Sequence, residues 1–374
     1  MKFKVSSSKL LGSLLSINRV IATKNTMAIL DSFLFQLNQN TLTVTASDRE
    51  TTLITTLEVE EAEGNGNVAI VAKFLLDALR EFPDQPIDFD INDANLAVVI
   101  KTTTGSYNFI GANGDEYPTL PQLEDDTQAF VLNGQTLLAG ISNTIFCAAE
   151  DELRPVMSGL YFDLKTDGIT IVATDAHKLV RYTNTSVTTE EPASFILAKK
   201  PAALLKNILP KEQGDVTIKF DNKNAHFAFS NHTMICRQVE GRYPNYQAVI
   251  PTNNPHRVIV DRLSLLNSLR RVSIFSNQGS SLVRLAFADN QIHISAQDID
   301  FSISAEERIA CQADDLTLNI GFKATFLIEI LSNLQSTDVI LELSDPSRSG
   351  LILPFEDQEN ENILMLLMPM LLNE

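Results

Sequence analysis

An aspartate and a histidine stand two residues apart in the string Val172-Ala-Thr-Asp-Ala-His-Lys-Leu179. Because both types serve as general bases and metal ligands, Asp175 and His177 are candidates for a metal-dependent hydrolase site. The rest of the chain argues against that site, since none of its 5 histidines lies four residues from another and neither HExxH nor GxSxG occurs. Aspartates also end two related strings, at Asp48 and Asp298, without a histidine after them. The recurrence predicts an aspartate that bonds to the turn after a strand, and no catalytic or metal-binding residue.

Glycine loops and cysteines give no sign of a cofactor. The phosphate-binding patterns GxxxxGK[ST] and GxGxxG are absent. Cys147, Cys236 and Cys311 are odd in number and far apart, which indicates neither a disulfide framework nor a zinc site. No segment resembles a signal peptide, and the most apolar run, from Ile363 to Leu372, has about half the length of a membrane span. We therefore expect a cytoplasmic protein without a cofactor.

The related strings recur as a long repeat. Each reads aliphatic, polar, aliphatic, then Ala and, two residues later, Asp: Leu42 to Asp48, Ile169 to Asp175 and Ile292 to Asp298. Their spacing of about 125 residues is the size of a whole domain rather than of a solenoid repeat. Linkers rich in Pro and polar residues follow Tyr117 and Pro251. The sequence therefore predicts three copies of one domain, with boundaries at residues 1–122, 123–252 and 253–374.

Each repeat has the same expected order of elements. An opening strand at residues 2–5, 129–132 or 257–260 leads into an amphipathic helix, in the first repeat with Leu10, Leu14, Ile17 and Ile21 at helical spacing. Strands, a second helix and more strands follow, with a hairpin turn predicted at Asp221 to Asn224. Strands punctuated by helices, without strict alternation, predict an α+β fold with mostly antiparallel sheets.

The charge distribution leaves two interpretations open. A net charge of −18 argues against a nucleic-acid partner, because phosphate binding normally uses a basic surface. Residues 1–30, 195–211 and 263–288, however, contain Lys and Arg but no acid, and these stretches consist largely of predicted helices. These cations are either a solvated helical face or a recurring DNA-binding surface.

Several strings together resemble one family, the bacterial DNA polymerase III beta subunit or replicative sliding clamp. They are the N-terminal Met-Lys-Phe, Thr26-Met-Ala-Ile-Leu30, Val172 to Leu179, Glu240-Gly-Arg-Tyr-Pro-Asn-Tyr246, Ile320-Gly-Phe and Leu366-Leu-Met-Pro-Met370. The resemblance runs the full length, in order. It implies a head-to-tail homodimer that forms a six-domain ring, with antiparallel sheets outside and two helices per domain inside. It also implies a processivity factor that encircles duplex DNA without sequence specificity and has no catalysis of its own.

The size of the expected ring can be checked from helix packing. Helices lie about 8 to 10 Å apart, so six of them in a circle leave no room for a duplex. Twelve helices leave a hole of roughly 28 Å, wide enough for B-DNA. A closed ring on DNA therefore needs two chains.

The resemblance carries over three sets of residues. For DNA binding it implies Lys24, Lys73, Lys199, Lys200 and Arg271. The segment Glu150 to Arg154 is acidic and lacks the aromatic pair that some members place against DNA, so whether it touches DNA stays open. For the dimer interface it implies Tyr107, Phe109, Ile274 and Phe275.

The third set is a cleft that captures short motifs from the replicative polymerase, the clamp loader and other partners. Its implied residues are Met157, Thr174, Ala176, His177, Lys178, Leu179, Pro244, Ala248, Val249, Phe326, Ser349, Leu367, Met368, Pro369 and Met370. Ala248 and Lys178 replace arginines of some members. From the residues alone, the C-terminal Leu-Met run favours a last core strand, with one wall of a peptide groove as the alternative. A scaffold that binds peptides but never DNA remains an alternative function.

Overall fold

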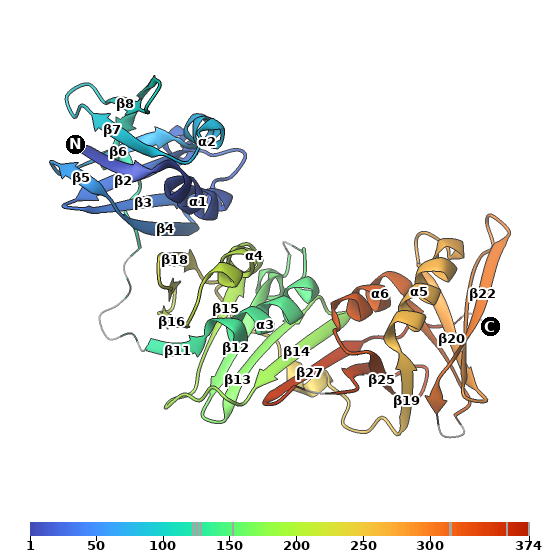
Figure 1. Ribbon diagram of the computed structural model, residues 1–374. Helices are drawn as coiled ribbons and strands as arrows, with labels where there is room; N and C mark the ends of the chain where they lie inside the picture. The colour runs from blue at the N-terminus through green and yellow to red at the C-terminus, as the bar shows by residue number, and fades with distance from the viewer. Residues whose placement is uncertain are drawn as a thin grey trace. The chain divides into compact units, whose positions relative to one another are not determined.

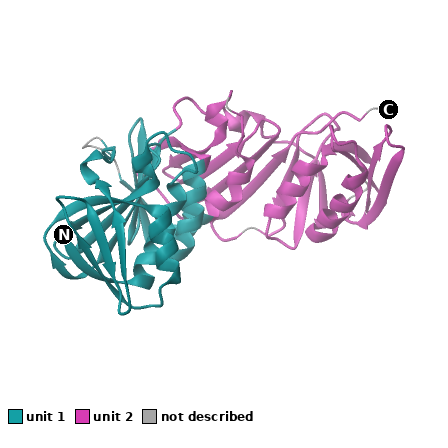
Figure 2. Ribbon diagram, turned by 90° about the horizontal axis from the view of Figure 1, so that it is seen from above, with its two compact units in different colours: residues 1–138, 200–238 teal, residues 139–199, 239–374 magenta. Residues whose placement is uncertain are grey.

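The computed structural model describes residues 1–121, 123, 127, 129–151, 153–313, 316–356 and 358–372 (Figure 1). The chain forms two compact units, which Figure 2 shows in different colours. Unit 1 comprises residues 1–138 and 200–238, and unit 2 comprises residues 139–199 and 239–374.

Unit 1 contains a five-stranded sheet of order β5-β1-β7-β8-β9 and a nine-stranded sheet of order β10-β6-β2-β3-β4-β18-β17-β16-β11. Its strands are β1 (Lys2–Ser6), β2 (Ser32–Asn38), β3 (Thr41–Ser47), β4 (Thr51–Glu58), β5 (Glu60–Glu63), β6 (Gly66–Val71), β7 (Pro86–Ile91), β8 (Ala97–Lys101), β9 (Ser106–Ile110), β10 (Ala112–Asn113), β11 (Ala129–Asn133), β16 (Asp215–Phe220), β17 (Asn224–Ala228) and β18 (His232–Arg237).

Unit 2 contains a nine-stranded sheet of order β15-β12-β13-β14-β27-β26-β25-β19-β23 and a four-stranded sheet of order β22-β21-β20-β24. Its strands are β12 (Gly159–Lys165), β13 (Gly168–Thr174), β14 (Lys178–Asn184), β15 (Ala193–Ala198), β19 (His256–Asp261), β20 (Leu282–Ala288), β21 (Gln291–Asp298), β22 (Ile303–Ala310), β23 (Gln312–Ala313), β24 (Leu318–Lys323), β25 (Asp338–Leu343), β26 (Gly350–Pro354) and β27 (Glu361–Leu367).

The α-helices of the described residues occur as one pair in each repeat. They are α1 (Ser7–Ile17), α2 (Ala72–Glu81), α3 (Gly134–Thr144), α4 (Lys199–Ile208), α5 (Arg262–Val272) and α6 (Ala324–Asn333). The expected opening strands are β1, β11 and β19, and the hairpin at Asp221 closes with its amide donating to the Asn224 carbonyl at 3.0 Å. All pairings between named strands are antiparallel, so the predicted α+β fold of three similar domains is confirmed.

Helix α1 shows how the repeat builds its core. The Ser6 hydroxyl accepts a hydrogen bond from the Lys9 amide at 3.3 Å and so caps the helix. Leu10, Leu14 and Ile17 are fully buried, as their spacing predicts. The expectation that Ile21 continues this helix is wrong, because a 3₁₀ turn, η1 (Asn18–Val20), ends it and the Ile21 amide bonds back to Asn18.

The second repeat supplies strands to both nine-stranded sheets. Strand β18 pairs with β4 of the first repeat, and β14 pairs with β27 of the third, with Leu179 opposite Leu366. The second repeat is therefore divided between the two units rather than forming a third one. The boundaries at residues 1–122, 123–252 and 253–374 stay a prediction, and Gln122 lies outside the described residues. No helix within the described ranges has the length and apolar character needed to cross a membrane.

Candidate functional site

The aspartate that ends each repeated string organises a turn. In Asp175 the Oδ1 atom accepts hydrogen bonds from the amides of His177 and Lys178, both at 2.9 Å. Asp48 bonds the amides of Glu50 and Thr51 in the same way, at 3.0 and 2.7 Å. The predicted structural role of this aspartate is confirmed, because both amides would otherwise lack a partner at the strand end.

The third copy keeps part of this arrangement: Asp298 Oδ1 accepts from the Asp300 amide at 3.0 Å. The turn after Asp175 is strained. Ala176 has a φ of 76°, in the left-handed region that residues other than glycine rarely adopt. Arg49 takes the equivalent φ of 79° in the first repeat. Because two copies share this conformation, the strain belongs to the turn itself.

Lys178 is a buried cation at the base of this turn. Its side chain is 5 % exposed, and its Nζ lies 2.7 Å from Asp175 Oδ2 and 3.3 Å from Glu329 Oε2 on α6. Burial raises the pKa of Asp175, but hydrogen bonds from Lys178 and His177 outweigh burial and hold this pKa below its usual value. Burial lowers the pKa of Lys178, but the bond to Asp175 and the nearby charges of Asp175 and Glu329 together outweigh burial and raise this pKa. The ion pair therefore stays charged near neutral pH and joins β14 to α6.

Three side chains that carry nitrogen pack against the ring of Phe326. The Nζ atoms of Lys178 and Lys323 lie 4.8 and 4.6 Å from the centre of its ring, close enough for cation–π attraction. The His177 imidazole, which is exposed, stacks on the same ring at a centroid distance of 5.9 Å. The His177 side chain therefore lies at the surface and packs against an aromatic ring. The Asp175 carboxylate is occupied by its hydrogen bonds to the turn amides and to Lys178. This geometry does not suit the hydrolase hypothesis.

The C-terminal run is both a core strand and an exposed tail. Strand β27 ends at Leu367, which is fully buried, whereas Met368 is 47 % and Leu371 83 % exposed. Two backbone bonds fix the tail: the Met368 amide donates to the His177 carbonyl at 2.9 Å and the Met370 amide to the Gly321 carbonyl at 2.8 Å. The core-strand interpretation is therefore correct for the part of the run that ends at Leu367. The interpretation of the exposed tail as one wall of a peptide groove stays a prediction.

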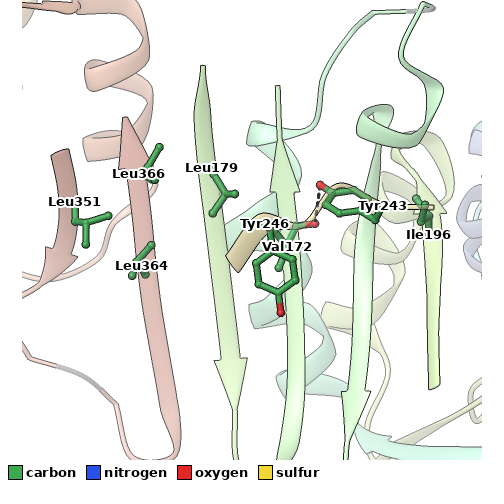
Figure 3. Close-up of a cluster of buried hydrophobic side chains, with 8 residues drawn as sticks. All are labelled: Val172, Leu179, Ile196, Tyr243, Tyr246, Leu351, Leu364 and Leu366. Atoms are coloured by element: carbon green, nitrogen blue, oxygen red, sulfur yellow. Dashed lines mark hydrogen bonds between the residues drawn. The ribbon is translucent and has the colours of Figure 1, made fainter. Parts of the chain in front are cut away.

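The Gly-Arg-Tyr-Pro segment packs against the sheet beneath the predicted cleft. Tyr243 and Tyr246 lie in a buried cluster, drawn in Figure 3, that also contains Leu179 of β14 and Leu366 of β27. The Tyr246 hydroxyl donates to Asp163 Oδ2 at 3.0 Å. The short helix η7 (Tyr246–Val249) leaves Val249 58 % exposed.

All predicted cleft residues belong to unit 2. Direct contacts join Lys178, His177 and Phe326, and the tail residues bond to His177 and Gly321. Ser349 makes a contact separate from these, because its backbone carbonyl accepts a hydrogen bond from Asn254 Nδ2 at 3.1 Å. Lys323 and Glu329 were absent from the predicted set. Lys323 directly follows the Ile320-Gly-Phe string and occupies the N-cap position of α6, and Glu329 lies within that helix. Their only signal in the sequence was their charge in an apolar segment.

The predicted DNA-binding cations fall into two classes. Lys24 and Lys73 are exposed and form no ion pair with any residue in the described ranges. Lys199 pairs with Glu150 at 2.8 Å, Lys200 pairs with Asp48, and Arg271 makes a two-pronged bond to Glu307 with both distances 2.6 Å. In the segment from Glu150 to Arg154, Arg154 pairs with Asp151 at 2.8 Å, and Glu152 lies outside the described residues.

The predicted interface residues lie near free sheet edges. Tyr107 and Phe109 lie on β9, the edge strand of its sheet, and Tyr107 packs on Phe82 at 4.8 Å. Ile274 and Phe275 lie in the short helix η8 (Ser273–Phe275) and are 73 % and 37 % exposed. Edge strands with exposed apolar side chains are templates for pairing with another chain.

Two exposed apolar residues near η8 were missed. Ile299 and Phe301 are 79 % and 73 % exposed and lead into β22, the other edge strand of unit 2's four-stranded sheet. The repeat contained the signal, because the residues after Asp48 and Asp175 are polar or small, whereas Asp298 is followed by Ile299 and, after Asp300, by Phe301.

A serine, a histidine and a glutamate also line up in unit 1. Ser16 Oγ lies 2.6 Å from His232 Nε2, and His232 Nδ1 lies 2.6 Å from Glu212 Oε1. Ser16 is within α1, however, and its hydroxyl also lies 2.6 Å from the Ser13 carbonyl. All three contacts are hydrogen bonds when Ser16 donates to Ser13 and the imidazole, with a proton on each nitrogen, donates to both Ser16 and Glu212. In that arrangement the histidine is a donor to the serine and not its base, and the group links α1 to β18.

Comparisons with known proteins agree along the whole chain. Family models described as the N-terminal, central and C-terminal domains of the DNA polymerase III beta subunit match residues 1–121, 131–245 and 247–371. A beta sliding clamp of Haemophilus influenzae is 26% identical over 365 residues, covering 98% of this chain and 99% of that protein. One of Synechococcus elongatus is 25% identical, covering 95% and 96%.

Solved structures show the same fold. A sliding clamp from Pseudomonas aeruginosa bound to griselimycin has a TM-score of 0.93 at 23% identity, with all of both chains covered. A clamp from Bartonella birtlesii, also bound to griselimycin, has a TM-score of 0.92 at 25% identity with the same coverage.

Proposed function

Because the chain belongs to the DNA polymerase III beta subunit family, we propose that two copies of it close head to tail into a ring around duplex DNA. As a beta sliding clamp it is the processivity factor of DNA polymerase III and catalyses no reaction itself. The domains at residues 1–122, 123–252 and 253–374 each contribute two helices to the inner surface, and twelve helices suffice for a duplex.

The proposed DNA-binding surface consists of Lys24, Lys73, Lys199, Lys200 and Arg271. These cations bind phosphates and read no bases, so the attraction is independent of sequence and permits sliding. The remainder of the chain is acidic enough to give a net charge of −18, which disfavours DNA on surfaces outside these helices. The ring acts on the bacterial chromosome, in the cytoplasm.

The proposed homodimer joins β9 of one chain to β22 of its partner. The support is that both are edge strands with exposed apolar residues nearby: Tyr107 and Ile110 on one side, Ile274 and Phe301 on the other. Burying a large side chain contributes about 1.5 to 3 kcal/mol, so four such residues stabilise a lasting contact. The pairing is heterologous, and two copies close it into a ring.

The proposed partner site comprises Met157, Thr174, Ala176, His177, Lys178, Leu179, Pro244, Ala248, Val249, Phe326, Ser349, Leu367, Met368, Pro369 and Met370. Thr174, Lys178, Leu179 and Leu367 are buried and support the exposed members of this set. Exposed Val249 and Met368, together with the partly exposed Phe326, supply apolar anchors for a short peptide. The partners are the replicative polymerase subunit, the clamp loader and other proteins with short clamp-binding motifs.

The observation that carries the function is the match of three consecutive family domains along residues 1–371. The test is retention on nicked circular DNA, measured by gel filtration before and after the circle is cut once. A ring stays on the circle and leaves once ends are available, because only a topological link responds to free ends. A peptide-binding scaffold would not be retained at all, and a protein that binds DNA from outside would stay after cutting.

A further inference from the structure

Three of the five proposed DNA-binding cations form an ion pair with a carboxylate of the same chain. Arg271 on α5 binds Glu307 on β22 through two bonds of 2.6 Å. Lys199 Nζ lies 2.8 Å from Glu150 Oε1, and Lys200 pairs with Asp48. A carboxylate in a two-pronged bond to arginine occupies the donors that a phosphate would use.

The ion pairs of Arg271 and Lys199 are exposed to solvent, so a phosphate can replace the carboxylate in each of them. The Arg271 side chain stays 61 % exposed while Glu307 is 29 % exposed, so a phosphate can approach the guanidinium without unfolding the strand. Exposed pairs of this kind contribute little to stability, because solvent and salt screen both charges. Hydrogen bonding from Arg271 lowers the pKa of Glu307, and bonding from Lys199 lowers the pKa of Glu150, so both acids stay charged.

We propose that Glu307 and Glu150 compete with the DNA phosphates for Arg271 and Lys199. Each carboxylate pairs with its cation when no phosphate is bound there, and it pairs with that cation again when the protein moves along the duplex. The proposal rests on the DNA-binding function proposed above. It names a regulation of that surface, a weakening of phosphate contacts by the protein's own acids, which lowers the barrier between neighbouring phosphates.

The competition has a signature in salt dependence. When Arg271 moves to a phosphate, the DNA releases a bound cation, but the freed Glu307 attracts one from solution. The net release is therefore smaller than for an unpaired cation such as Lys24 or Lys73. Removing the carboxylate restores the full release, which steepens the slope of log affinity against log salt by up to about 0.9 for each cation.

The test measures binding of the intact protein to a short fluorescent duplex with open ends over a series of salt concentrations. Glu307→Gln should raise the affinity roughly two- to five-fold and steepen the slope. Glu306→Gln is the matched control, since Glu306 is the next residue on β22 and pairs with His293 instead. Glu150→Gln should act like Glu307→Gln through Lys199.

A double-mutant cycle separates exchange at one pair from general charge effects. In an Arg271→Gln background, Glu307→Gln should have no more effect than Glu306→Gln. The proposal is overturned if the gain persists without Arg271, or if Glu306→Gln gives the same gain. Either result would leave retention on circular DNA unchanged, whereas a wild-type protein that is not retained on the circle would refute the ring itself. Sedimentation of each variant as a dimer shows that the interface is intact.

Discussion

The Met370 amide donates a hydrogen bond of 2.8 Å to the carbonyl of Gly321, at a point where Gly321 has no room for a side chain. A Cβ atom there would lie 2.7 Å from the Met370 carbonyl oxygen and 2.8 Å from Leu372 Cδ2. The obstacle is backbone, which cannot rotate away. The C-terminal tail therefore reaches β24 only because residue 321 is glycine.

Gly321→Ala should displace the tail and weaken binding of a polymerase-derived peptide at least ten-fold, measured by calorimetry. A chain that ends before Met368 should show the same loss, with dimer formation and DNA retention unchanged in both. Gly12→Ala is the control, because its Cβ would meet nothing within 4 Å and the site is in helix α1. Unchanged peptide affinity in both tail variants would mean that the tail is not a wall of the site.

Ala176→Gly should stabilise the protein. The left-handed φ of 76° costs an alanine about 1 to 2 kcal/mol that a glycine avoids, offset in part by the entropy of glycine in the unfolded chain. We expect a rise of about 1 kcal/mol in the free energy of unfolding of unit 2, measured with denaturant. The same substitution at Ala203, within α4, should instead destabilise by about 1 kcal/mol. A loss at both sites would show that the turn is unstrained.

The Asp175 turn should weaken in acid. The pKa of Asp175 is lowered from its ordinary value of 3.8, so its contribution to stability is complete above that value and is lost as pH falls through the lower folded value. Asp175→Asn should remove about 1.5 to 3 kcal/mol at neutral pH and flatten this part of the acid dependence. The control Asp345→Asn changes an exposed turn aspartate bonded to Ser347, and should cost much less. Equal acid profiles for wild type and Asp175→Asn would contradict this assignment.

Ile274→Ala combined with Phe275→Ala should convert dimers into monomers at micromolar concentration, measured by sedimentation, because several kcal/mol of apolar burial is lost. Phe301→Ala should weaken the dimer further. Leu263→Ala, at the start of α5, is a control of similar exposure, 52 %, outside the proposed contact. A double variant that still sediments as a dimer would place the interface elsewhere.

Lys24→Gln and Lys73→Gln should each weaken DNA binding equally for all sequences and reduce the salt slope by about 0.9, because neither cation exchanges with an internal carboxylate. Arg271→Gln should change the slope less, because Glu307 already competes for that cation. Binding to duplexes of different sequence checks the first expectation. A loss confined to one sequence would be incompatible with sliding.

Local patterns in the sequence predicted the repeating parts of this protein. The apolar spacing at Leu10, Leu14 and Ile17 predicted a helix because burial on one face follows the helical period directly. The Asp at positions 48, 175 and 298 predicted a turn because a short carboxylate reaches amides two and three residues ahead. The resemblance to the family then implied which segments form the proposed cleft.

Tertiary structure alone decided which distant residues pair. Leu179 lies opposite Leu366 only because β14 and β27 adopt one register of the nine-stranded sheet, and no local pattern contains that register. The same holds for the charges: Lys24 and Arg271 look equivalent in the sequence, yet the fold places Glu307 against one of them and leaves the other without a carboxylate partner among the described residues. Periodicity and turn chemistry depend on neighbours within a few residues, whereas register and ion pairing depend on segments that only the folded chain brings together.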